Sequence, residues 1–208
     1  MKVYYIWDAY CGWCYGFNSI FKPFHENHPE LEIEMISGGL FVGDNSKKIG
    51  EYGFFEEGNK QIALLFPVNF GEKNKQLIEE GTLVLDSYGP ANAFAVLREL
   101  VPQKEWSELA YAIQQQYFVE GKSLSDIDTY MELAEKFRLD EAQLKKSLVQ
   151  AFSDNKRAEK DFVSAYQKGA TSFPTVIAEV NGKFYDLRGQ AMSVEDLENN
   201  YQILSKEG

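Results

Sequence analysis

The stretch that decides the fold is Lys2-Val-Tyr-Tyr-Ile-Trp-Asp-Ala-Tyr-Cys-Gly-Trp-Cys-Tyr-Gly16. Its opening apolar run predicts a strand, and three further residues are enough for a connecting loop. Apolar residues then recur at helical spacing as far as Phe24, which predicts a helix with one buried side. The two cysteines of the chain, Cys11 and Cys14, therefore lie where this strand passes into this helix.

A Cys-x-x-Cys pair at such a junction is typical of a thiol–disulfide redox site. The first amides of a helix have no intrahelical acceptor and carry partial positive charge, so they stabilise a thiolate at Cys11. Gly12 and Trp13 carry no cation, so the backbone must supply most of this effect, and an ionised Asp8 would oppose it. Cys14 lies one turn further in and is expected to stay protonated. We therefore expect Cys11 to attack disulfides and Cys14 to resolve the mixed disulfide.

The pair could also be a structural disulfide or one half of a zinc site. His25 and His28 complete a C-x2-C-x10-H-x2-H pattern, which has too short a spacing between its histidines for a Cys2His2 zinc finger. On one helix, with a rise of about 1.5 Å per residue, they would lie roughly 15 to 20 Å from Cys11, too far for one tetrahedral site. We expect two surface histidines near a helix end, and neither a metal nor an organic cofactor.

Composition narrows the class of protein. The 208 residues suit one domain, with or without a large insertion, and a hydrophobic content of 44% supplies a sizeable core. A formal net charge of -11 argues against nucleic acid or an anionic membrane as the main partner. The N-terminus does not resemble a signal peptide, and no stretch approaches the roughly 20 apolar residues that cross a bilayer. We expect a cytoplasmic protein, where Cys-x-x-Cys pairs are more often catalytic than structural.

The rest of the chain predicts further strands around a helical block. Residues 31–36 alternate apolar and polar side chains, which indicates a second strand parallel to the first because a helix separates them. Residues 175–180 and 183–187 indicate a hairpin around Asn181-Gly182, and a capped helix follows. The order is β-α-β, a long helical block, then β-β-α. We therefore expect an α/β fold with a discontinuous domain and an all-helical insertion. Their bounds are 1–45 with 169–208, and 46–168.

Phe173 and Pro174 stand just before the third expected strand. In a thioredoxin-like arrangement this strand lies beside the first, which brings Pro174 opposite Cys11. We expect a cis bond before Pro174 that presents backbone groups to an extended thiol substrate, with a trans proline that opens a strand as the alternative. Phe173, Pro174 and Trp13 are the expected substrate contacts. The aromatic residues Tyr10 and Tyr15 could extend this docking surface or could be ordinary packing.

Two segments resemble the DsbA-like branch of the thioredoxin superfamily, most of all its FrnE-like group, described as predicted protein-disulfide isomerases. They are Tyr5-Ile-Trp-Asp-Ala-Tyr-Cys-Gly-Trp-Cys-Tyr-Gly16 and Gly169-Ala-Thr-Ser-Phe-Pro-Thr175. The resemblance implies a thioredoxin-like fold with a helical insertion, in which Cys11 is the nucleophile, Cys14 the resolving cysteine and Pro174 the cis-proline. DsbA itself has a histidine between its cysteines, so its strong oxidant character is not implied for this Gly-Trp pair.

These observations together predict a thiol–disulfide oxidoreductase that acts on protein or low-molecular-weight thiols and disulfides. One alternative is a glutathione-dependent transferase or isomerase of the kappa-class type. That class uses a serine at the position of Cys11, so the intact dithiol argues against it. The other alternative is a non-enzymatic redox-sensing module whose disulfide only switches conformation.

Overall fold

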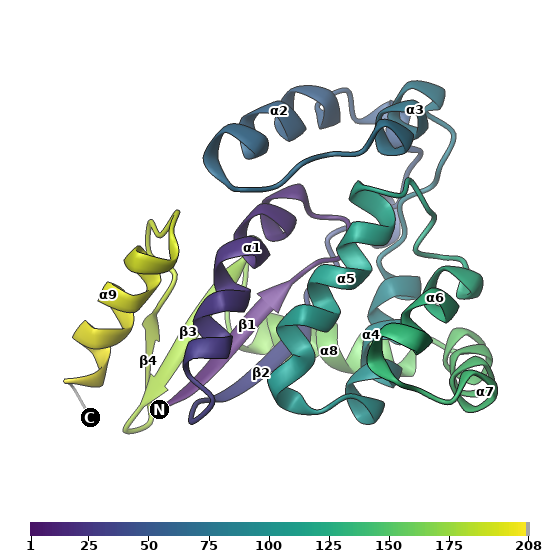
Figure 1. Cartoon of the computed structure of the whole chain (residues 1–208). Coiled ribbons are helices and arrows are strands. Elements are labelled where there is room, and N and C mark those ends of the chain that lie inside the picture. Colours follow the sequence, from purple (N-terminus) through teal and green to yellow (C-terminus); the bar gives the residue numbers. More distant parts are fainter. Residues whose placement is uncertain (207–208) are drawn as a thin grey trace.

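A four-stranded sheet forms the centre of residues 1–206, the part of the chain that the computed structural model describes (Figure 1). The strands lie in the order β2-β1-β3-β4. β1 is parallel to β2 and antiparallel to β3, and β3 is antiparallel to β4. The strands are β1 (Lys2–Trp7), β2 (Glu32–Ser37), β3 (Thr175–Val180) and β4 (Lys183–Asp186). The parallel pairing of the first two strands, expected from the sequence, is confirmed.

Helices cover both faces of this sheet. α1 and α9 lie on one face, and α8 lies on the other (Figure 1). Helices α2 to α8 occupy the chain between β2 and β3, so the expected α/β fold with a helical insertion is confirmed. The helices are α1 (Gly12–Asn27), α2 (Phe55–Leu65), α3 (Glu72–Glu80), α4 (Tyr88–Leu100), α5 (Trp106–Phe118), α6 (Ile127–Phe137), α7 (Glu141–Phe152), α8 (Lys156–Gln167) and α9 (Val194–Ser205).

β1 is the strand that both layers of helices enclose. On the α1 side, the ring of Tyr5 lies 4.3 Å from the ring of Phe21. On the other side, Ile6 joins a small buried cluster with Ala165 of α8. A strand with both faces buried needs an almost continuous apolar sequence, which is the pattern that opens this chain.

Local sequence signals set the ends of several elements. Ser193 and Asp196 form a capping box at the start of α9, with the Ser193 hydroxyl accepting a hydrogen bond from the Asp196 amide at 3.1 Å. The turn from β3 to β4 is Asn181-Gly182, whose φ angles of 50° and 74° are those of a tight two-residue hairpin. Both features were expected from the sequence, and both are confirmed.

The expectation of two surface histidines is wrong for His25. Its side chain is 3% exposed, and its Nδ1 lies 2.9 Å from the Ser107 hydroxyl of α5. His25 lies four residues after the buried Phe21, so the helical period places it on the same buried face of α1. His28 is half-buried between Glu30 and Glu198. Residues 1–206 contain no cluster of three or more His, Cys, Asp or Glu side chains that could hold a metal ion.

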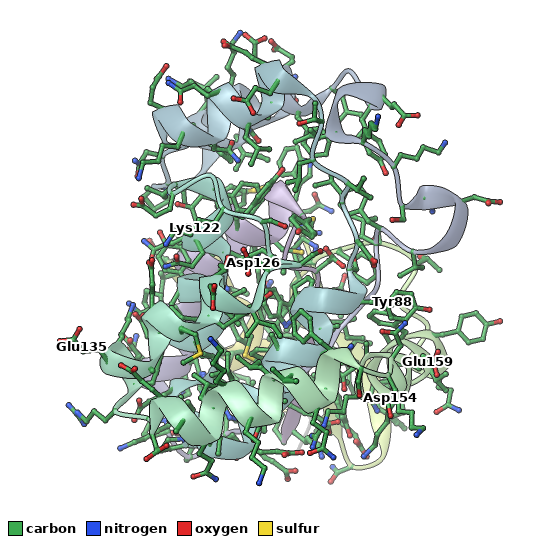
Figure 2. All side chains as sticks on the ribbon, turned by 90° about the vertical axis from the view of Figure 1, so that its right-hand side faces the viewer. Tyr88, Lys122, Asp126, Glu135, Asp154 and Glu159 are labelled. Atoms are coloured by element: carbon green, nitrogen blue, oxygen red, sulfur yellow. The ribbon has the colours of Figure 1, made fainter. Side chains whose placement is uncertain are left out.

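Acidic side chains are prominent on the outer face of the helical segment. Glu135 of α6, Asp154 in the connection between α7 and α8, and Glu159 of α8 are all exposed there (Figure 2). They contribute to the formal net charge of -11. Among the described residues, no helix has the length and apolar character needed to span a membrane.

Candidate active site

The connection from β1 to α1 places Cys11 immediately before the first turn of the helix. Cys11 is the N-cap of α1, and its amide donates a hydrogen bond to the Asp8 carbonyl at 3.2 Å. Its Sγ accepts a hydrogen bond from the Cys14 amide at 3.4 Å, in the way that a serine or aspartate oxygen caps other helices. The position that the sequence indicated for Cys11 is therefore confirmed. A thiolate here faces an unshared helix amide and the positive end of the helix dipole.

Cys14 lies beneath Cys11, and both side chains are free thiols. Cys11 is 5% exposed, whereas Cys14 is fully buried. Burial raises the pKa of the Cys14 thiol well above its ordinary value, and the hydrogen bond and charge interaction with Cys11 raise it further. The Asp8 backbone amide acts in the opposite direction but does not offset them. The structure thus keeps Cys14 protonated, as expected, while Cys11 is the sulfur nearer to solvent.

The loop before β3 completes the site from the far end of the chain. The Phe173–Pro174 peptide bond is cis, as expected from the sequence. β3 pairs with β1 so that Thr175 lies opposite Ile6, which brings this loop beside the cysteines. The Cys11 thiol donates to the Phe173 carbonyl at 3.7 Å. A backbone group that is 162 residues away in sequence therefore faces the sulfur of Cys11.

The expected substrate contacts differ in exposure. Pro174 is buried, and Phe173 is half-buried with its ring against Gly38, where an added Cβ would lie 2.1 Å from the ring. Trp13 remains 37% exposed at the first turn of α1. The structure thus brings Cys11, Phe173 and Pro174 together and leaves the Trp13 ring partly open to solvent.

Two aromatic residues near the cysteines belong to the core. Tyr10 and Tyr15 are both 0% exposed. The Tyr10 hydroxyl accepts a hydrogen bond from the Leu124 amide at 3.0 Å, and the Tyr15 ring stacks on Phe118 of α5. These two tyrosines are packing residues, so the alternative that they form part of a docking surface is excluded.

The Asp8 side chain forms hydrogen bonds to two loops beside the dithiol. Its carboxylate accepts hydrogen bonds from the Tyr10 amide at 3.0 Å and the Leu40 amide at 2.8 Å. The carboxyl is 2% exposed, and this burial raises its pKa although hydrogen bonds, including one from Ser87, oppose the rise. The Asp8 side chain therefore joins the residue just before Cys11 to the loop that follows β2.

Helix α2 lies against the first turns of α1, a contact that the sequence analysis did not predict. A Cβ added at Gly12 would lie 2.8 Å from Ile62 Cδ1, and one added at Gly16 would lie 2.6 Å from Phe66 Cδ2. Both glycines therefore allow α2 and the residue that follows it to approach α1 closely. The available signal was a pair of glycines at i and i+4 inside a helix, which often has a packing reason.

An N-cap cysteine, a buried second cysteine and a cis-proline loop on the neighbouring strand together define a thioredoxin-like dithiol site. Comparison with family models and with curated proteins returns no match. Solved structures do match over the whole chain, and they show that the fold is that of DsbA-like proteins with a helical insertion.

Three of these matches are similar in size to this chain. The cytosolic disulfide reductase DsbM from Pseudomonas aeruginosa has a TM-score of 0.84 and 19% identity, with 100% of each chain covered. The same protein solved with GSH has a TM-score of 0.81 and 20% identity, covering 99% of this chain and 100% of the other. A candidate protein disulfide isomerase from Nitrosomonas europaea has a TM-score of 0.79 and 16% identity, covering 100% and 98%.

Proposed function

We propose that this protein is a thiol–disulfide oxidoreductase that works through Cys11 and Cys14. The observation that carries the proposal is the placement of the Cys11 sulfur between the start of α1 and the Phe173 carbonyl, directly above the buried thiol of Cys14. The names of the similar structures, a disulfide reductase and a candidate disulfide isomerase, agree with this activity.

The reaction proceeds in two exchange steps. The Cys11 thiolate attacks one sulfur of a substrate disulfide, which forms a mixed disulfide and releases the other half of the substrate as a thiolate. Cys14 then loses its proton and attacks the Cys11 sulfur, which forms the Cys11–Cys14 disulfide and releases the second half. The substrate gains two electrons and the protein loses two. Two external thiols return the protein to its reduced form by the reverse sequence.

We propose low-molecular-weight thiols and disulfides, with glutathione as the first candidate, as the partners of this dithiol. Cys11 is only 5% exposed, so a small or extended substrate reaches it more easily than a folded surface does. One of the similar structures was solved with GSH, which supports the same choice. A cytoplasmic location would provide such thiols at high concentration.

In this proposal the two parts of the chain have different roles. The discontinuous part, residues 1–45 and 169–208, carries the dithiol, the cis-proline and the expected substrate contacts Phe173 and Trp13. The helical part, residues 46–168, covers the dithiol through α2 and so limits which disulfides can approach.

Single cysteine substitutions test the assignment of roles. Cys11→Ser removes the attacking sulfur and is expected to abolish exchange with glutathione disulfide, measured as thiol release. Cys14→Ser keeps the attack but removes the resolving thiol, so the mixed disulfide accumulates and is detected by intact-protein mass spectrometry. Full turnover by Cys11→Ser would show that the roles are wrong.

The same assays separate the two alternatives. A redox-sensing module would form its internal disulfide once and would show no multiple turnover with excess glutathione and glutathione reductase. A glutathione transferase would conjugate glutathione to an electrophile even as Cys14→Ser. Multiple turnover of disulfide by the wild type, without conjugation by Cys14→Ser, is the result that our proposal requires.

A further inference from the structure

A cavity of about 310 Å³ lies next to the cis-proline loop. Pro174 and Thr175 line one part of it, and Asp186 and Arg188, at and beyond the end of β4, line another. We call it the Pro174 cavity. The carbonyl of Phe173 faces the Cys11 sulfur, and Pro174 is the next residue. A substrate that is joined to Cys11 by a disulfide bond can therefore extend its other groups into this cavity.

The backbone of the sheet holds the main chain of Arg188 at the edge of this cavity. The Arg188 amide and that of Leu187 both donate to the Val176 carbonyl, at 3.3 Å and 2.9 Å. The guanidinium carbon lies 5.5 Å from the centre of the Phe17 ring of α1, within the range of a cation–π contact. These contacts fix Arg188 between the β3–β4 hairpin and α1, which is the helix that carries the dithiol.

Arg188 differs from two other arginines of the chain in its partners. Arg98 forms an ion pair with Asp161, and Arg157 forms one with Glu99. Within residues 1–206, Arg188 has no carboxylate partner, and its buried Nε has no hydrogen-bond partner. Asp186 shares the cavity, but its Oδ1 accepts a hydrogen bond from the Gly189 amide at 3.0 Å and it forms no ion pair with Arg188.

A buried guanidinium nitrogen without a hydrogen-bond acceptor is unfavourable, because it has lost water and gained no partner in exchange. The planar guanidinium group binds carboxylates through two parallel hydrogen bonds, which makes a carboxylate its best-matched ligand. The net charge of -11 repels anionic substrates from the protein as a whole. A substrate that bears a carboxylate therefore needs a local cation, and Arg188 is a cation that lines the same cavity as Pro174.

We propose that Arg188 binds a carboxylate group of the disulfide substrate in the Pro174 cavity. The proposal rests on the proposed oxidoreductase function and narrows its substrates to acidic low-molecular-weight disulfides, such as those of carboxylate-bearing cysteine peptides. Arg188 is thus a binding residue that selects the substrate, and it takes no part in the transfer of electrons.

Two disulfide substrates test whether Arg188 selects for a carboxylate. Glutathione disulfide carries carboxylates, and hydroxyethyl disulfide carries none. Arg188→Met keeps an unbranched apolar side chain at this position but removes the guanidinium group and its charge. We expect the rate constant for oxidation of the reduced protein by glutathione disulfide to fall about tenfold, which corresponds to about 1.4 kcal/mol. The rate constant with hydroxyethyl disulfide should stay unchanged.

Two further variants control for charge and geometry. Lys183→Ala removes one positive charge from the exposed start of β4, at the other end of the hairpin, and should leave both rate constants unchanged. Arg188→Lys keeps the charge without the planar pair of donors and should recover only part of the rate with glutathione disulfide. An equal fall with both disulfides, or an equal fall in Lys183→Ala, would overturn the proposal.

A binding measurement separates this proposal from the oxidoreductase function. S-Methylglutathione has no free thiol and cannot exchange, so its dissociation constant, measured by calorimetry, reports recognition alone. We expect binding to the wild type and about tenfold weaker binding to Arg188→Met. If the wild type oxidises with neither disulfide but still shows this difference, the oxidoreductase proposal fails and the carboxylate site stands. Equal binding by the wild type and Arg188→Met overturns the carboxylate site, whatever the activity.

Discussion

The two ends of α1 differ in the groups that surround their titratable side chains. At the N-terminal end, the Cys11 sulfur contacts the Cys14 amide and the Phe173 carbonyl, both of which are backbone groups. At the C-terminal end, His28 lies between two carboxylates, 2.9 Å from Glu30 and 2.7 Å from Glu198. The helix has 16 residues, so these ends are separated by about 24 Å.

This difference shows where each end obtains its stability. The reactive end depends on loops that are held in place, since backbone groups act only if the chain positions them. The opposite end depends on side-chain charges, since a protonated histidine near a helix C-terminus is favourable and offsets the two carboxylates. Perturbing one end should therefore leave the other unchanged, which the following variants test.

Asp8→Ala is expected to have the largest effect. It leaves the buried amide of Tyr10 and the partly buried amide of Leu40 without their acceptor, and each such loss costs about 1–3 kcal/mol. We expect the free energy of unfolding in urea to fall by about 2–4 kcal/mol. The rate of Cys11 alkylation should change as well, because the loop that positions this sulfur is loosened. A fall of less than about 1 kcal/mol would show that these loops do not depend on the carboxylate.

His28→Gln is expected to have a smaller effect that depends on pH. Burial lowers the pKa of His28, but its hydrogen bonds to Glu198 and Glu30 outweigh burial, so the folded-state pKa lies above the ordinary value of 6.5. Such a group stabilises the fold below the unfolded-state pKa and loses this contribution as the pH rises through the folded-state pKa. The wild type should therefore exceed the variant by about 0.5–1 kcal/mol at pH 5.5 and by less at pH 9.

The dithiol supplies the control for this histidine variant. The alkylation rate of Cys11 in His28→Gln should equal that of the wild type at each pH, because the substitution lies at the far end of α1. A changed rate would mean that the two ends of the helix are coupled after all. A stability difference that grows with pH would contradict the protonated state of His28.

Trp13→Phe is expected to have the smallest effect on stability. Trp13 is 37% exposed, and phenylalanine keeps most of its packing, so the free energy of unfolding should change by less than about 0.5 kcal/mol. If the indole contacts the substrate, the rate with a protein disulfide should fall about twofold to fivefold, as expected for a weakened aromatic contact. Reduction of insulin measures this rate, and an unchanged rate would remove Trp13 from the substrate contacts.

The sequence predicted the parts of the fold that local patterns determine. The apolar run before the cysteines marked β1, the Asn181-Gly182 turn marked the β3–β4 hairpin, and Cys11 proved to be the N-cap of α1. Pro174 was predicted to lie opposite Cys11 because it stands just before the third expected strand. In a thioredoxin-like arrangement that strand lies beside the first one. These signals are short in sequence and have a direct physical cause.

The features that the sequence did not predict depend on distant partners. His25 was expected at the surface because nothing near it in sequence reveals Ser107, which satisfies it inside the core. The approach of α2 to Gly12 depends on Ile62, fifty residues further along the chain. The isolation of Arg188 becomes visible only when the surrounding side chains are in place.

The glycine between the cysteines has a consequence for attempts to tune this protein. The two residues between such cysteines are commonly substituted to change the reduction potential of the dithiol. These substitutions are usually interpreted as direct effects on the two sulfurs. Here the space above Gly12 belongs to Ile62, so any larger side chain meets a neighbouring helix before it influences a sulfur. A larger residue at position 12 would therefore move the end of the Ile62 side chain, and the reduction potential of such a variant should be compared with that of a version in which Ile62 has been shortened.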